Sequence, residues 1–142
     1  MKPVTFLRIA SVLTLVHSAM HTIGGVFGST PEGPASIAAA AMKANQFQFM
    51  GATRTFWDFH LGRGMAVTIF LTAEGVAFWL LGSLAKRNAV EIRPILGVFA
   101  LGYVAFAVDS LMYFFMLPGI FEAVIAACLT AAMATAKPAA AG

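Results

Sequence analysis

The chain has 142 residues, of which 60% are hydrophobic and 11% charged, and its mean hydropathy is +0.85. This composition excludes a soluble globular domain and a disordered chain, because the apolar surface exceeds what a small core can bury. The net charge of +3 comes from basic residues scattered at the ends of apolar runs, so we expect no nucleic-acid partner. Cys128 is the only cysteine, which excludes an internal disulfide and a cysteine-based zinc cluster. The length indicates a single domain over residues 1–142.

Four apolar runs each approach the ~20 residues that a helix needs to cross a bilayer. They cover residues 5–27, 62–84, 94–116 and 120–136. Two histidines within the first run favour a membrane span over a cleaved signal peptide there. Pro94 lies where a first helical turn tolerates proline, and Leu117-Pro118-Gly119 predicts a tight turn between the last two spans. The sequence therefore predicts an all-α, polytopic, four-transmembrane-helix bundle in contact with the lipid bilayer.

Basic residues are distributed unequally between the two sides of this predicted bundle. One side holds six lysines and arginines and the other three, so the positive-inside rule places both termini in the cytoplasm. The six are Lys2, Arg8, Lys86, Arg87, Arg93 and Lys137, and the three are Lys43, Arg54 and Arg63. The long connection on the external side contains an alanine-rich stretch, Ala35–Met50, which predicts a short external helix. Aromatic residues around Trp57 follow it, and they indicate either an interfacial belt or a lid over a cavity.

Five ionisable side chains lie inside the predicted spans, where a charge at a helix centre costs about 2.5–3.5 kcal/mol. They are His17, His21, Glu74, Asp109 and Glu122. Counting ~1.5 Å per residue from the cytoplasmic ends places His17 and Glu74 near the bilayer midplane. The same count places the other three in a higher layer, drawn from three different helices. Asp109 and Tyr113 are four residues apart and share one helix face, as His17 and His21 do, so we expect both pairs to face inward.

This arrangement predicts a buried site for a small apolar ligand of sterol, isoprenoid or quinone type, with acid–base chemistry on that ligand. In this hypothesis His21, Asp109 and Glu122 carry the proton chemistry. The ligand-binding residues are His17, Glu74, Tyr113, His60, Asp58 and Trp57. An alternative hypothesis is a non-catalytic membrane subunit of a redox or transport complex, whose polar residues hold helices together or contact a haem or a metal. Assembly into a homo-oligomer or a larger complex is left open.

A metal or haem site is a less favoured interpretation of the same residues. Two imidazoles with carboxylates suit a transition metal, and His21 with His60 is the only sensible axial pair for haem. However, the chain has no Glu-x-x-His motif of the kind that di-iron bundles use. Arg63 would also repel a cation from the polar entry route. We therefore predict no cofactor and no stoichiometric metal.

Two segments that flank the external connection carry a resemblance to a known family. They are His-Ser-Ala-Met-His-Thr-Ile-Gly-Gly at 17–25 and Phe-Trp-Asp-Phe-His-Leu-Gly-Arg-Gly at 56–64. With the four-span layout, the chain resembles small bacterial four-helix inner-membrane proteins of the DoxX-like kind over roughly its whole length. This resemblance implies the fold and a location in the bacterial inner membrane, and many such proteins have no assigned activity. The layout also looks like that of sterol-isomerase-type bundles, but those usually have five spans, so no residue role is transferred.

Overall fold

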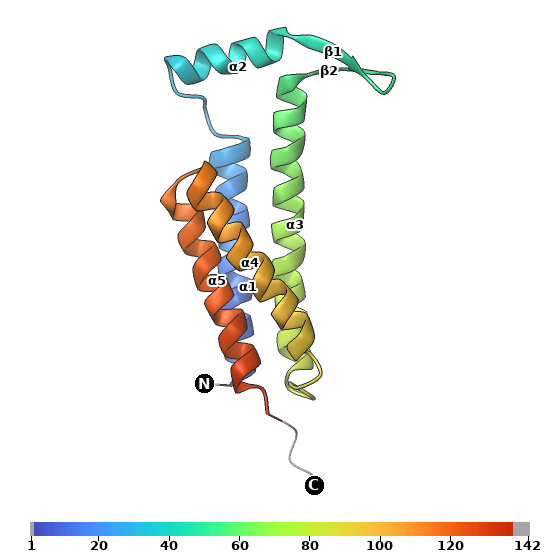
Figure 1. Cartoon of the computed structure of the whole chain (residues 1–142), viewed down its shortest axis with the longest axis vertical. Helices are drawn as coiled ribbons and strands as arrows, with labels where there is room; N and C mark the ends of the chain where they lie inside the picture. Colours follow the sequence, from blue (N-terminus) through green and yellow to red (C-terminus); the bar gives the residue numbers. More distant parts are fainter. Residues whose placement is uncertain (1, 138–142) are drawn as a thin grey trace. The chain divides into compact units, whose positions relative to one another are not determined.

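The computed structural model of the protein describes residues 2–137 and is mostly helical (Figure 1). Four of its helical segments are long and apolar enough to cross a membrane: Pro3–Val26, Phe56–Leu84, Arg93–Tyr113 and Met116–Thr135. A short helix lies between the first two in the sequence. The predicted multi-pass helical architecture with four spans is therefore confirmed, and the chain is an integral membrane protein.

The first span combines helix α1 (Pro3–Met20) with a π-helical turn, η1 (His21–Val26). The amide of Phe27 donates to the carbonyl of Thr22, five residues back, at 3.0 Å. The Thr22 hydroxyl in turn donates to the carbonyl of Ser18 at 2.7 Å. Such turns are rare within helices and occur often at functional sites. The change from α-helix to π-helix therefore draws attention to His21 as a candidate site residue.

Helix α3 (Phe56–Leu84) begins at Phe56, whereas the sequence analysis placed the second span at residues 62–84. The earlier start has a clear cause, because Thr55 and Asp58 form a reciprocal capping box. The backbone amide of Thr55 donates to Oδ2 of Asp58 at 2.7 Å, and the amide of Asp58 donates to the Thr55 hydroxyl oxygen at 3.1 Å. The sequence Thr-Phe-Trp-Asp is the signal that would have given this boundary.

Helices α4 (Arg93–Tyr113) and α5 (Met116–Thr135) lie side by side (Figure 1). The predicted turn at residues 117–119 is wrong, because the chain reverses at Phe114 and Phe115 and Pro118 lies in the first turn of α5. Proline is tolerated there, since the amides of a first helical turn have no partner in the helix. Gly119 allows a close approach, because a Cβ on it would lie 2.8 Å from Cγ of Leu111.

The connection between the first two spans contains a helix and a β-hairpin, and the prediction of one helix over Ala35–Met50 is wrong after Ala44. Helix α2 (Pro34–Ala44) is followed by strands β1 (Gln46–Phe49) and β2 (Ala52–Thr55), which pair antiparallel. Met50 and Gly51 form the two-residue turn, with φ values of 48° and 83°. Two positive φ values match the tight turns that suit the twist of a hairpin.

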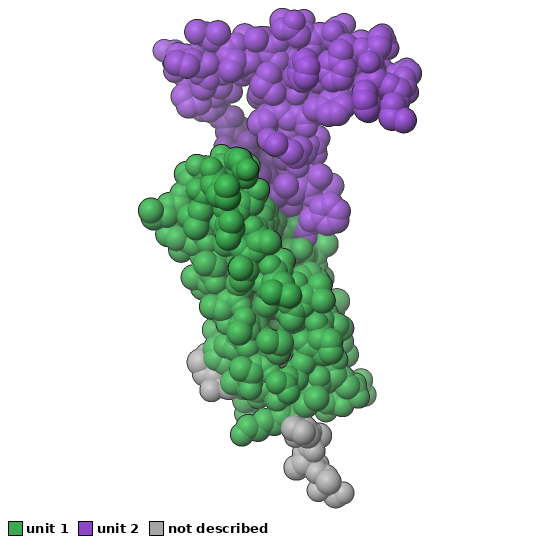
Figure 2. Space-filling model, viewed as in Figure 1, with its two compact units in different colours: residues 1–17, 71–142 green, residues 18–70 purple. Residues whose placement is uncertain are grey.

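The chain forms two compact parts, which Figure 2 colours separately. Among the described residues, the first part comprises 2–17 and 71–137, and the second comprises 18–70. The first part has a continuous apolar core, whose fully buried members include Leu7, Phe78, Leu96, Ile125 and Leu129. The organisation of residues 1–142 as a single folding domain stays a prediction.

Candidate functional site

A hydrogen-bonded group of polar side chains lies inside the first part. Tyr103 on α4 is buried, and its hydroxyl donates to Oε2 of Glu74 on α3 at 2.7 Å. The Thr14 hydroxyl on α1 lies 3.4 Å from that of Tyr103 and donates to the carbonyl of Ala10 at 2.9 Å. Thr14 and Tyr103 each lie roughly 15 Å along their helices from the first residue, which places the group near the middle of the spans.

Two hydrogen-bond arrangements fit these distances. When Glu74 is ionised, it accepts the hydrogen of the Tyr103 hydroxyl. When Glu74 is protonated, its carboxyl group can donate to Tyr103, whose own hydrogen can then turn towards Thr14. The hydrogen-bonded group therefore extends from α3 through α4 to α1.

A second carboxylate, Glu122 on α5, is the most deeply buried acid in the described chain. It is 1% exposed, and Ser110 on α4 donates a hydrogen bond to its Oε1 at 3.0 Å. Its other oxygen, Oε2, is buried and has no hydrogen-bond partner within residues 2–137. Since nearly all buried polar atoms in proteins are paired, this oxygen needs an explanation.

His17 on α1 lies among aromatic side chains of α4 and α5. Its ring is buried, 5.6 Å from that of Phe121 on α5 and 6.5 Å from that of Phe106 on α4. The ring of Phe106 is also 6.5 Å from that of Tyr103. Half-buried aromatic side chains thus lie next to His17 and Tyr103 in the first part. We call the polar members the core polar cluster: Thr14, His17, Glu74, Tyr103, Ser110 and Glu122.

An apolar groove runs along the surface between α4 and α5. Its walls are Val104, Ala107, Val108 and Leu111 on α4, and Ala123, Ala126, Ala127, Thr130, Ala131 and Ala134 on α5. Ala107 precedes Ser110 by three residues, and Ala126 follows Glu122 by four, so each is next to that polar residue on its helix surface. The Ser110–Glu122 pair therefore lies directly beside two small side chains of the groove.

The structure distributes the predicted proton-handling residues over both parts. Glu122 lies in the core polar cluster, whereas His21 is partly buried in the second part. The His21 Nε2 atom lies 3.1 Å from the carbonyl oxygen of Gly64, and a carbonyl only accepts, so this nitrogen carries the hydrogen. The inward orientation predicted for Asp109 and Tyr113 is wrong, since both side chains are exposed on α4. The inward face of this helix carries Tyr103, Ala107 and Ser110 instead, at intervals of three and four residues.

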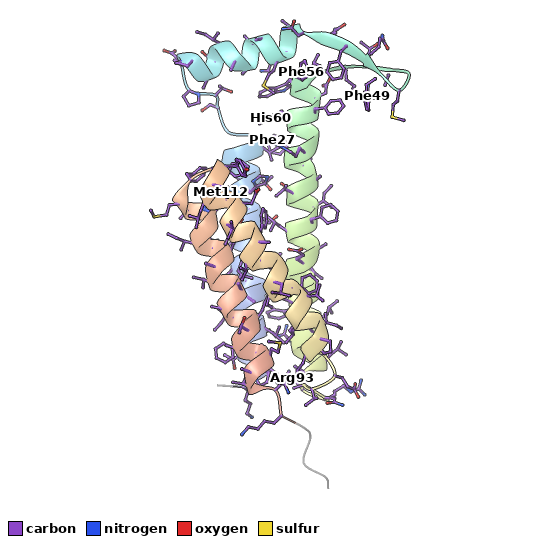
Figure 3. All side chains as sticks on the ribbon, viewed as in Figure 1. Phe27, Phe49, Phe56, His60, Arg93 and Met112 are labelled. Atoms are coloured by element: carbon purple, nitrogen blue, oxygen red, sulfur yellow. The ribbon has the colours of Figure 1, made fainter. Side chains whose placement is uncertain are left out.

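The predicted ligand-binding residues divide in the same way. His17 and Glu74 belong to the core polar cluster, and Tyr113 is exposed at the end of α4. The other three residues lie at the start of α3. There the Asp58 carboxylate accepts hydrogen bonds from the amide and hydroxyl of Thr55, so it serves as a helix cap. The rings of His60 and Trp57 lie 5.3 Å apart, and His60 is exposed near Phe56 (Figure 3). Lys43 Nζ lies 4.3 Å from the Trp57 ring centroid, a cation–π contact.

Sequence reasoning missed two contributors to the core polar cluster, Tyr103 and Ser110. Neither residue is among the ionisable side chains from which the sequence predicts the site. A usable signal was present, because Leu96, Ala100, Tyr103, Ala107 and Ser110 form one stripe at intervals of three and four residues. Small residues on that stripe indicate the face at which α4 packs closely against neighbouring helices.

Within residues 2–137, no group of three or more His, Cys, Asp or Glu side chains is arranged to hold a metal ion. The expectation that the purified protein lacks a cofactor stays a prediction.

No protein-family profile matches the chain, and neither the curated proteins nor the solved structures contain a significant match. The four-span architecture is thus an observation, while the likeness to DoxX-like proteins stays an expectation.

Proposed function

We propose that this membrane protein binds a small apolar molecule with one polar end, of sterol, isoprenoid or quinone type, in the α4–α5 groove. The observation that carries this proposal is the buried Oε2 atom of Glu122, which has no hydrogen-bond partner within the described chain. Glu122 is one helical turn before the groove residue Ala126, and in this proposal its free oxygen receives a polar group that arrives from the lipid.

The chemistry of the groove suits an apolar ligand. Nine of its ten lining residues are alanine, valine or leucine, and Thr130 already donates its hydroxyl hydrogen to the carbonyl of Ala126 at 2.9 Å. The alanines of α5 leave room beside the helix backbone, whereas the α4 side supplies larger aliphatic side chains. A flat or chain-like hydrocarbon would gain dispersion contacts there without leaving a polar group unpaired.

The polar end of the ligand would reach Glu122 between Ala107 and Ala126. A ligand hydroxyl would donate to an ionised Glu122, and a ligand carbonyl would accept from a protonated one. The same position permits proton transfer between Glu122 and the ligand, with His17 and the Glu74–Tyr103 pair as further proton-holding groups in the core polar cluster. In this version Glu122 is the central acid–base residue, and the predicted roles of His21 and Asp109 become secondary.

Filling the groove tests where the ligand binds. Ala127 is an exposed groove residue, so Ala127→Leu should occupy the groove without disturbing the core. Lipid extraction and mass spectrometry of the purified protein should then find the co-purifying apolar molecule reduced about tenfold, which corresponds to ~1.4 kcal/mol. Ala105→Leu is the matched control, because Ala105 is also exposed on a span but lies outside the groove. An equal amount of ligand in both variants would contradict this location, as would the finding of no bound molecule in the unaltered protein.

The exposure of Asp109 favours a second candidate, a subunit of a larger membrane assembly. An acidic side chain that is exposed on a membrane span needs a polar partner, unless it reaches the interface. Asp109 lies one turn before the end of α4, about 6 Å from Tyr113, so a partner subunit and the headgroup region are both within reach. Cross-linking from position 109 in intact membranes would reveal such a subunit or a second copy of this chain.

We also propose a bacterial inner-membrane location with both termini in the cytoplasm. The support is the six-to-three distribution of lysine and arginine between the two sides of the spans. A cysteine introduced at Ala35, an exposed position near the start of α2, should react with a membrane-impermeant reagent added outside intact cells. Labelling only after cell lysis would reverse the orientation.

A further inference from the structure

Arg8 on α1 has an unusual environment within the first part of the chain. Its guanidinium carbon lies 3.5 Å from the centroid of the Trp79 ring on α3, which is a close cation–π contact. Its Nη2 donates a hydrogen bond to the Ser83 hydroxyl at 3.0 Å. Its Nη1 is buried and has no acceptor among residues 2–137. The stacking on Trp79 thus holds a charged side chain whose hydrogen-bonding capacity is only partly used.

Arg8 also lacks a compensating negative charge. No carboxylate of the described residues pairs with it, and its known contacts are an aromatic ring and a neutral hydroxyl. A guanidinium group stays protonated under all conditions of interest, so it cannot escape this cost by losing its proton. A counter-charge for Arg8 would therefore have to come from outside the described chain.

The depth of Arg8 indicates what supplies that charge. It lies five residues after Pro3, about 8 Å from the start of α1, and contacts Ser83, one residue before the end of α3. Trp79 is 49% exposed at the same level, and tryptophan is enriched where spans meet the headgroup region. Three exposed basic residues also lie between the end of α3 and the start of α4: Lys86, Arg87 and Arg93, the last labelled in Figure 3.

We propose that Arg8 and Trp79 form a binding site for the phosphate of an anionic phospholipid headgroup. A guanidinium fork matches two phosphate oxygens, and a turn of the group within the plane that Trp79 holds would bring the buried Nη1 to them. Lys86, Arg87 and Arg93 bias the site towards lipids with net negative charge. The exposed apolar side chains of Ile9 and Val12, which follow Arg8 on α1, would contact the acyl chains below the phosphate.

The test compares the thermal stability of the protein in vesicles of phosphatidylcholine alone and in vesicles of equal parts phosphatidylcholine and phosphatidylglycerol. The unaltered protein should be more stable in the anionic vesicles and should retain phosphatidylglycerol in native mass spectrometry. Arg8→Gln should lower that retention about tenfold, whereas Arg93→Gln, which removes an exposed charge nearby, should lower it less than about twofold. Equal losses in the two variants would overturn the proposal, since they would indicate only a general electrostatic attraction.

Two further arms keep the test decisive. Arg8→Lys keeps the charge but lacks the fork, so its retention should lie between those of the unaltered protein and Arg8→Gln, and full retention would contradict the proposed geometry. Trp79→Leu leaves Arg8 in place and should weaken lipid retention if the stacking prepares the site. Inorganic phosphate added to phosphatidylcholine vesicles should not reproduce the stabilisation. If it did, a soluble phosphate rather than a lipid would be the ligand.

Discussion

The two compact parts of the chain place their polar side chains in different settings. In residues 18–70, hydroxyl and imidazole groups connect the first span to α3, as in the 3.0 Å contact between the Thr22 and Thr68 hydroxyl oxygens. The acids of that part are exposed, and one of them, Asp58, caps a helix. In the other part, the Glu122 carboxylate lies in the interior beside buried hydroxyl groups.

This difference shows which polar residues are candidates for chemistry. A hydroxyl that bonds to a backbone carbonyl or a carboxylate that caps a helix has its structural role fulfilled. A buried carboxylate with one unpaired oxygen reduces stability, so its presence calls for a ligand, a proton or a partner. Histidine and acidic residues on the spans therefore have different meanings in the two parts.

The largest expected effect concerns the close packing of helices, which we expect to be tighter in the first part than in the second. Gly119→Ala should lower the free energy of unfolding by about 1–3 kcal/mol, because its Cβ would meet Leu111 and push α4 and α5 apart. Gly62→Ala is the control in the second part, since nothing lies within 4 Å of a Cβ there, and alanine should stabilise α3 slightly. Thermal unfolding in detergent measures both. Equal stability of the two variants would contradict the expected difference in packing between the two parts.

The next effect tests the structural role of Asp58. Thr55→Ala removes the hydroxyl that caps α3 and should lower stability by about 1 kcal/mol. The loss should be local, so hydrogen exchange of the amides at residues 56–59 should accelerate while those of α5 keep their rates. Faster exchange throughout α5 would mean that the two parts unfold together, which would contradict the prediction of a local effect.

The smallest effect concerns the hydrogen bond at Glu74. Tyr103→Phe removes the donor to Glu74 Oε2 and should lower stability by about 0.6 kcal/mol, the average for polar contacts between membrane helices. Tyr113→Phe is a matched control, because Tyr113 is the other tyrosine of α4 and is 71% exposed. Both variants are compared by thermal unfolding. An equal or larger loss for Tyr113→Phe would argue that the buried pair contributes nothing specific.

Hydropathy alone was sufficient to predict the four spans, since ~20 apolar residues have few alternatives to crossing a bilayer. Boundaries were less predictable, because they depend on local chemistry such as the Thr55–Asp58 capping box and the Met50-Gly51 turn. Gln46–Phe49 alternates polar and aromatic residues with the period of a strand, yet the alanine-rich neighbour suggested that the helix continued.

The candidate site was only partly predictable for a different reason. Spans that are apolar on every side give no pattern from which to tell the inward face, so Asp109 was expected to lie inside and is exposed. Glu74 and Glu122 were identified because a carboxyl group in a span is rare. Tyr103 was overlooked because an aromatic residue in a span is ordinary, and only its contact with Glu74 distinguishes it.

The central claim is that Glu122 receives the polar end of an apolar ligand. It is tested most directly by neutralising Glu122 and Glu74, one at a time, and measuring how much ligand stays bound. The unaltered protein, Glu122→Gln and Glu74→Gln are purified in the same way, and the bound apolar molecule is quantified per chain by mass spectrometry. The account predicts that Glu122→Gln retains about tenfold less than the unaltered protein, while Glu74→Gln, whose partner is Tyr103, retains nearly as much. Full retention by Glu122→Gln, in a protein that still unfolds cooperatively, would contradict the claim.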